Sequence, residues 1–151
     1  MEDNKQKTIE LITRAVIVHN DKILLCREKN KDNFFLPGGH IEFGEDAVTA
    51  LKREIKEETD AGMVKANFIG VSENRFWQGG AEKHEINIVF EAQLTSPDSQ
   101  DMEDHIECRW LTLAEFKEGR VLPILLKEKV LQWMQDKQIF FGSEKNNTQL
   151  V

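Results

Sequence analysis

Three glutamates near the middle of the chain have a spacing that suits metal-assisted chemistry. Glu54 precedes Glu57 and Glu58 by three and four positions, so on a helix the three carboxylates fall within one arc of roughly 60–100°. Like charges repel at this spacing, and the C-terminal part of a helix disfavours anions. A bound cation would offset both penalties. Carboxylate oxygens suit Mg²⁺ or Mn²⁺, so the pattern predicts a site for one of these ions.

Residues around the glutamates support this interpretation. Gly38 and Gly39 precede the predicted helix, and glycine lets the backbone approach closely, so the carbonyl of Gly39 is a further candidate ligand. Arg53 can pair with Glu45 or Glu57 and fix their side chains, which makes it an organiser of the catalytic residues. Gly38 and Glu45 are expected to support the site structurally. The alternative is a solvated helix end rich in glutamate, which leaves these fixed spacings unexplained.

Hydrophobic patterning predicts the elements that position these residues. Val48, Leu51 and Ile55 form an apolar stripe that packs the glutamate-bearing helix. The order β-β-β-α-β-β-β-α predicts an α/β fold with a mixed sheet between helices. We expect a single domain over residues 1–142 and a polar, frayed tail over 143–151. The predicted strands are 9–19, 22–27, 34–36, 66–74, 85–94 and 107–111, and the predicted helices are 45–60, a short segment that starts with a capping box at 112–115, and 124–136.

Charge and composition argue against several classes of protein. The chain has 151 residues and a formal net charge of −7, which disfavours stable binding to nucleic acid. A nucleotide substrate remains compatible with this charge, because bound cations would reverse the local potential. No apolar run has the length of a membrane span, and residues 1–7 lack the apolar core of a signal peptide, so we expect a cytoplasmic protein without membrane contact. Cys26 and Cys108 are expected to be reduced, packed thiols.

The spacing of the glycine, arginine and glutamates resembles the signature of the Nudix hydrolases, Gly-x5-Glu-x7-Arg-Glu-apolar-x-Glu-Glu-x-Gly-apolar. The chain departs from it at Asp60, where the family has glycine, although Asp tolerates the left-handed conformation better than most residues. The box extends from Gly39 to about Ala61, and flanking segments extend the resemblance over about residues 9–133. The matching residues are Gly39, Glu45, Arg53, Glu54, Ile55, Glu57 and Glu58.

This resemblance implies a Nudix-type α/β/α sandwich and Mg²⁺-dependent hydrolysis, with Mn²⁺ as the alternative ion. The reaction would cleave a phosphoanhydride bond of a nucleoside diphosphate linked to a group X, by attack of activated water on phosphorus. Glu57 and Glu58 match metal-binding positions, and Glu54 matches one that either binds metal or helps activate water. The general base is left open between a carboxylate of the helix and one on a later loop, such as Glu103.

Substrate contacts are predicted from basic and aromatic residues around the strands. Arg14, Arg27 and Arg75 are candidates to bind phosphate, with a solvated or salt-bridged role as the alternative. Phe34, Phe35, Phe76 and Trp77 are candidates to stack on a base, with core packing as the alternative, and Phe76 and Trp77 are favoured because they border a glycine-containing loop. The favoured substrates are small molecules, either (d)NTPs including oxidised forms or a nucleotide sugar such as ADP-ribose. The alternative function is a non-catalytic Nudix-fold module that senses a nucleotide or binds a protein, and the resemblance leaves a homodimer open.

Overall fold

The computed structural model describes residues 7–97 and 105–149, with the backbone alone described for 146–149. Eight strands and three helices are formed by these residues. They are β1 (Glu10–Val16), β2 (Val18–His19), β3 (Lys22–Glu28), β4 (Gly38–His40), α1 (Ala47–Thr59), β5 (Met63–Gln78), β6 (Ala81–Leu94), β7 (Ile106–Thr112), α2 (Leu113–Glu118), α3 (Ile124–Asp136) and β8 (Phe140–Gln149).

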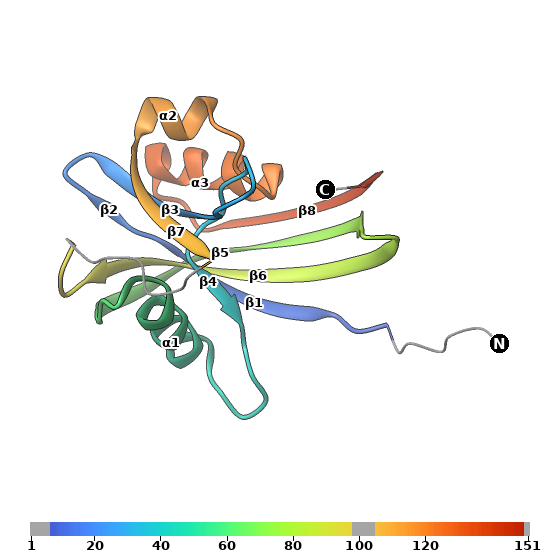
Figure 1. Cartoon of the computed structure of the whole chain (residues 1–151), viewed down its shortest axis with the longest axis horizontal. Helices are drawn as coiled ribbons and strands as arrows, with labels where there is room; N and C mark the ends of the chain where they lie inside the picture. Colours follow the sequence, from blue (N-terminus) through green and yellow to red (C-terminus); the bar gives the residue numbers. More distant parts are fainter. Residues whose placement is uncertain (1–6, 98–104, 150–151) are drawn as a thin grey trace.

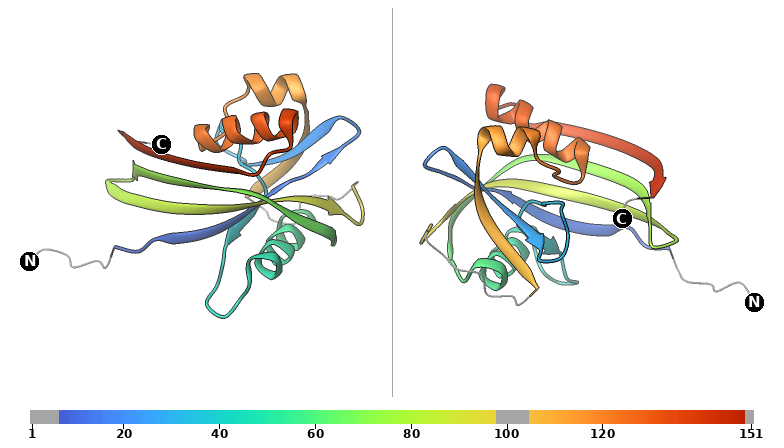
Figure 2. Two further views of the ribbon diagram at one scale, coloured as in Figure 1. Left: turned by 180° about the vertical axis from the view of Figure 1, so that it is seen from behind. Right: turned by 45° about the horizontal axis from the view of Figure 1, so that its top comes forward.

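The strands form two sheets that lie between helices. One sheet has the order β4-β1-β6-β5-β8, and the other has the order β2-β3-β7. The β1–β6 and β5–β8 pairs are parallel and the remaining pairs are antiparallel, so the larger sheet is mixed. Figure 1 shows α1 on one side of the strands and α2 with α3 on the other, and the two views in Figure 2 agree. This layering confirms the predicted α/β/α sandwich. No helix within the described ranges has both the length and the apolar character needed to cross a bilayer.

The apolar core consists of two clusters that belong to the two helical layers. Successive side chains of a strand point to opposite faces, so neighbouring residues of β1 contribute to different clusters. Val16 packs in the cluster of Phe116 from α2 and Trp133 from α3, whereas Ala15 packs in the cluster of Leu51 from α1. The strands therefore bury both faces, which fixes α1 against one side of the fold.

The ends of α1 are set by two aspartates. The Asp46 carboxylate accepts a 2.8 Å hydrogen bond from the Thr49 backbone N–H and so caps the first turn. Asp60 ends the helix with a φ of 59°, which confirms that aspartate takes the left-handed conformation at this position. The predicted apolar stripe is only partly buried, because Leu51 is fully covered whereas Val48 is 40% exposed.

The two later helices have the predicted starts. At the start of α2, Thr112 Oγ1 accepts a hydrogen bond from the Glu115 N–H, and Glu115 Oε1 accepts one from the Thr112 N–H, so the predicted capping box is present. The α3 helix has the predicted bounds, residues 124–136.

Two predicted segments differ from the structure. Residues 34–36 make only isolated bridges within the described chain, and the strand lies instead at Gly38–His40, where it pairs with β1. Residues 143–149, which were expected to be frayed, belong to β8 and pair in parallel with β5 as far as Gln149. This segment is held by backbone hydrogen bonds to the long strand β5. Because this pairing is made by backbone atoms, the polar sequence of the segment did not indicate a strand.

The prediction of two reduced thiols is also wrong for this structure, in which Cys26 and Cys108 form a disulfide. The two residues face each other in the β3–β7 register, and their Cα atoms are 4.0 Å apart. They are 82 residues apart in sequence. The disulfide therefore depends on the pairing of β3 with β7, which the sequence pattern did not predict.

Phe116→Ala is expected to lower the free energy of unfolding by about 3–5 kcal/mol, because it removes a large side chain from a closely packed core. Phe116 is fully buried, whereas Phe141 on β8 is 65% exposed and serves as the matched control. Phe141→Ala should change the stability by no more than about 0.5 kcal/mol. Urea unfolding of both variants measures the difference, and equal losses would contradict the assignment of the core.

Candidate active site

Arg53 lies at the centre of a network of carboxylates. Its Nε and Nη2 atoms donate to the two oxygens of Glu45, each at 2.9 Å, which is a bidentate pairing. Its Nη1 atom donates to Glu54 at 2.8 Å and lies 3.6 Å from an oxygen of Glu57. Its Nη2 atom also donates to the backbone carbonyl of His40 at 3.0 Å, which ties α1 to β4. The pairings that the sequence predicted for Arg53 are thus both present.

This network fixes the charges of its members. The pKa of Glu45 is lowered from 4.5 to about 2, chiefly by the hydrogen bond from Arg53 and then by the backbone N–H of Glu42, which donates at 3.1 Å. The hydrogen bond to Glu45 in turn raises the pKa of Arg53 above its ordinary value. Glu45 and Arg53 therefore stay ionised at neutral pH, and the loop before α1 is fixed to the helix.

The three glutamates of the box have different surroundings. Glu58 is only 2% exposed, and its Oε1 atom accepts a 3.0 Å hydrogen bond from the Gly38 backbone N–H. Glu54 lies against Gly39, since a Cβ atom added at Gly39 would come within 2.4 Å of the Glu54 carboxyl carbon. Glu57 has a side chain that is 49% exposed. The Glu58 carboxylate is therefore buried at β4, the Glu54 carboxylate packs on β4, and the Glu57 carboxylate faces the solvent.

The two glycines of β4 make this approach of α1 possible. Gly38 has a φ of 141°, and a Cβ atom there would lie 1.9 Å from the Thr13 carbonyl oxygen. In the β1–β4 register Gly38 is opposite Arg14 and Gly39 is opposite Thr13. Side chains at these positions would push β4 away from β1 or displace Glu54. Glycine at both positions therefore brings the glutamates to the edge strand of the larger sheet.

A cleft of about 340 Å³ is lined in part by all three residues of β4. Arg14 reaches into it from β1, donates from Nη1 to the Leu36 carbonyl at 2.9 Å, and lies over the Phe35 ring at 5.7 Å. Burial lowers the pKa of Arg14, although Glu58 and Glu85 act in the opposite direction. The cleft lining includes Arg14, Phe35, Gly38, His40, Phe76 and Glu85. The lining also includes Lys31 and Glu28, so the cleft combines two cations, two phenylalanine rings and two carboxylates.

Other predicted substrate residues lie elsewhere. Arg27 pairs with Glu107 at 3.1 Å, which is the salt-bridged role that the sequence left open. Arg75 is directed to the Ser143 hydroxyl at 3.4 Å, on the face opposite Phe76. Trp77 follows Phe76 on β5 and so also points away from it, with 43% of the residue exposed. Within the described chain, the predicted contacts that line the cleft are Arg14, Phe35 and Phe76. The predicted base Glu103 lies outside the described residues.

Glu85 is a cleft residue that the sequence reasoning did not identify. It lies on β6 opposite Glu10 of β1 and Asn74 of β5, and burial raises its pKa. The available signal was the alternation of polar Glu85 and Asn87 with apolar residues of the same strand. On a strand buried on both faces, polar residues on one face indicate a ligand or water. Asn87 is fully buried, and its Nδ2 atom has no hydrogen-bond partner in the described structure.

The donors beside β4 fit a hard divalent cation. Glu54, Glu57 and Glu58 offer carboxylate oxygens, and the backbone at Gly39 adds a carbonyl oxygen with no side chain in the way. Oxygen donors of this kind suit Mg²⁺ or Mn²⁺. The donor chemistry thus matches the ion that the sequence predicted, whereas the oxygens of the three glutamates do not all lie within 4.8 Å of one another in the described structure.

Glu45→Gln is expected to reduce the loss of stability in acid. The pKa of Glu45 is about 2 in the folded chain and ordinarily 4.5, so between these values the unfolded chain binds the proton more readily. The stabilisation is therefore complete above pH 4.5 and is lost as the pH falls toward 2. Urea unfolding at several pH values should show a shallower acid loss for E45Q than for the wild type.

The exposed Glu118 on α2 provides the matched control, since Glu118→Gln makes the same chemical change away from Arg53. That variant should follow the wild-type pH dependence. An acid loss for E45Q equal to that of the wild type would show that the Arg53 pairing does not lower the pKa of Glu45.

Comparison with known proteins extends these observations. An ADP-ribose pyrophosphatase from Methanocaldococcus jannaschii is 42% identical over 81 residues, which are 50% of this chain and 46% of that protein. The matched region spans less than half the length of the curated relatives. Among solved structures, a MutT protein from Methanosarcina mazei Go1 is 25% identical with a TM-score of 0.71, over 87% of this chain and 97% of that one.

A second solved structure supports the fold alone. The MutT protein from Bacillus halodurans is 20% identical with a TM-score of 0.73, and the match covers 91% of this chain and 90% of that one. The family model of the NUDIX domain matches residues 10–134, which include the whole Arg53 network and every residue that lines the cleft. Because this match covers well over half of the sequence, the chain belongs to the NUDIX family.

Proposed function

We propose that the chain is a Mg²⁺-dependent pyrophosphohydrolase, with Mn²⁺ as the alternative ion, that cleaves a phosphoanhydride bond of a nucleoside diphosphate linked to a second group. The observation that carries the proposal is the Arg53 network, which fixes carboxylates at the edge strand β4 beside a cleft. Membership of the NUDIX family and the similarity to a protein named ADP-ribose pyrophosphatase support the same reaction class.

The residues of α1 have distinct roles in this proposal. Glu54, Glu57 and Glu58 would hold the cation together with the Gly39 carbonyl. When bound, Mg²⁺ neutralises charge on the phosphoryl oxygens and lowers the pKa of a bound water. Arg53 orients Glu54 through its 2.8 Å hydrogen bond, and the Gly38 N–H orients the buried Glu58. Glu54 is the proposed general base, and Glu103 is the alternative base from the sequence.

The cleft favours a nucleotide sugar such as ADP-ribose as the substrate. Arg14 supplies positive charge for a phosphate, and Phe35 and Phe76 supply apolar surface for a base. Glu85 would repel an additional phosphate, whereas its carboxylate could accept hydrogen bonds from sugar hydroxyls. A (d)NTP, including its oxidised forms, is the second candidate, supported by the likeness to the MutT protein of Methanosarcina mazei Go1. A cytoplasmic location and a homodimer stay predictions.

Product release from a substrate panel, with and without Mg²⁺, tests the proposal. The panel holds ADP-ribose, other nucleotide sugars, canonical and 8-oxo (d)NTPs, dinucleoside polyphosphates and capped RNA. ADP-ribose should be hydrolysed only with the metal. Glu57→Gln should lower kcat/KM by more than about 100-fold. This loss exceeds the roughly 10–100-fold that follows from mutating a residue that only supports a metal ligand. The exposed Glu128 on α3 gives the matched control, and Glu128→Gln should keep full activity.

The other outcomes distinguish the alternatives. Full activity in E57Q would contradict the assigned metal site. Faster hydrolysis of (d)NTPs than of ADP-ribose would contradict the role given to Glu85. If folded protein that still binds Mg²⁺ hydrolyses none of the panel substrates, the non-catalytic binding module is favoured.

A further inference from the structure

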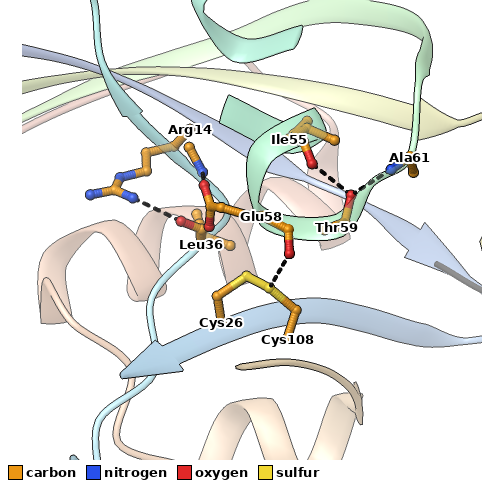
Figure 3. Close-up of a disulfide and its surroundings, with 9 residues drawn as sticks. Arg14, Cys26, Leu36, Ile55, Glu58, Thr59, Ala61 and Cys108 are labelled. Carbon is orange, nitrogen blue, oxygen red and sulfur yellow. Dashed lines mark hydrogen bonds between the residues drawn. A yellow bond between two sulfur atoms is a disulfide. The ribbon is translucent and has the colours of Figure 1, made fainter. Parts of the chain in front are cut away.

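A second group of metal-ligating side chains lies beneath the C-terminal end of α1. Cys26 on β3 and Cys108 on β7 face the last turn of the helix, where the Cys108 Sγ atom lies 4.0 Å from the Glu58 carbonyl oxygen (Figure 3). The two sulfurs and a carboxylate oxygen of Glu58 all lie within 4.8 Å of one another. No other set of three such donors comes this close within residues 7–97 and 105–149.

We propose that Cys26, Cys108 and Glu58 bind one thiophilic divalent cation, such as Zn²⁺ or Cd²⁺, when the disulfide is reduced. Thiolate sulfurs prefer such ions to Mg²⁺, so this site differs in its metal from the oxygen donors beside β4. Two sulfurs and one carboxylate oxygen supply three of four tetrahedral positions, and water can take the fourth.

The dithiol form arises by ordinary thiol–disulfide exchange. Two molecules of a thiol reductant donate two electrons and two protons, the bond between Cys26 and Cys108 breaks, and the reductant becomes its own disulfide. Each cysteine is then a thiol. The cation displaces both thiol protons and is bound by two thiolates and the carboxylate. A reducing compartment would keep the pair in this form.

The geometry of the strands suits this cation. With Zn–S bonds of about 2.3 Å and Zn–O bonds of about 2.0–2.2 Å, tetrahedral ligand atoms lie roughly 3.4–3.8 Å apart. After reduction the two sulfurs must move apart to reach this spacing, whereas the Glu58 carboxylate oxygen already lies within 4.8 Å of both. The facing Cα atoms, 4.0 Å apart, hold both sulfurs on one side of the β3–β7 pair. Cys26 and Glu58 are almost fully buried, so little water competes for the ion.

The site would also influence the reaction, because Glu58 belongs to both donor sets. A thiophilic cation held by the cysteines would engage the Glu58 carboxylate and so weaken Mg²⁺ binding beside β4. Zn²⁺ or Cd²⁺ should therefore inhibit the reduced protein more than the oxidised protein. This consequence rests on the proposed function, whereas binding of the cation to the cysteines does not.

Titration of the full chain with Cd²⁺ alone, followed by thiolate-to-metal charge-transfer absorbance, tests the site. Reduced protein, freed of reductant, should saturate at one Cd²⁺ per chain, and the oxidised protein of the same sequence should show no such band. Cys26→Ser and Cys108→Ser should each weaken binding by more than about 100-fold. Cadmium NMR of the wild type should give the shift of mixed sulfur and oxygen ligation.

The glutamates supply the matched controls. Glu58→Gln keeps an oxygen that can accept from the Gly38 N–H, but its amide is a poor ligand, so Cd²⁺ affinity should fall. The Glu57→Gln variant should bind Cd²⁺ like the wild type, although it is expected to lose hydrolysis. Its behaviour therefore distinguishes a failure of the proposed cation site from a failure of the proposed hydrolase function. The cation site is refuted if reduced, folded protein with two reactive thiols gives no charge-transfer band, or if E58Q binds as tightly as E57Q.

Discussion

The pairing of Arg53 with Glu45 and Glu54 is the interaction on which the site depends. One guanidinium holds the loop before α1, a box glutamate and the His40 carbonyl, so it joins the helix to the edge strand. Arginine suits this role because its planar fork donates several hydrogen bonds in fixed directions and stays charged. Without it, carboxylates crowded on one helix would repel one another.

Glycine at the edge of the sheet is the second constraint. Gly38 and Gly39 let α1 approach β4 so closely that Glu58 accepts a backbone hydrogen bond and Glu54 packs on the strand. The same short strand lines the cleft together with Arg14 and Phe35, so the acidic donors and the cleft meet at β4. A strand with side chains at both positions would not bring a helix and a cleft together in this way.

Local patterns in the sequence predicted the helical part of the site well. The glutamate spacing, Asp60 at the helix end and the capping box of α2 all depend on residues a few positions apart, and the structure has these features. Features that depend on distant pairing were not predicted. Cys26 meets Cys108 across 82 residues, and polar β8 is held by the backbone of β5. Trp77 was a candidate to stack on a base, but strand alternation points it away from the cleft that Phe76 lines.

Diffraction from crystals soaked in Mn²⁺ would test the central claim most directly, because anomalous scattering locates the ion without relying on turnover. We expect an anomalous peak bonded to carboxylates of Glu54, Glu57 and Glu58, with the Arg53–Glu45 pairing intact. A peak at Cys26 and Cys108 alone, or no peak beside β4 in crystals where Mn²⁺ binds elsewhere, would contradict it.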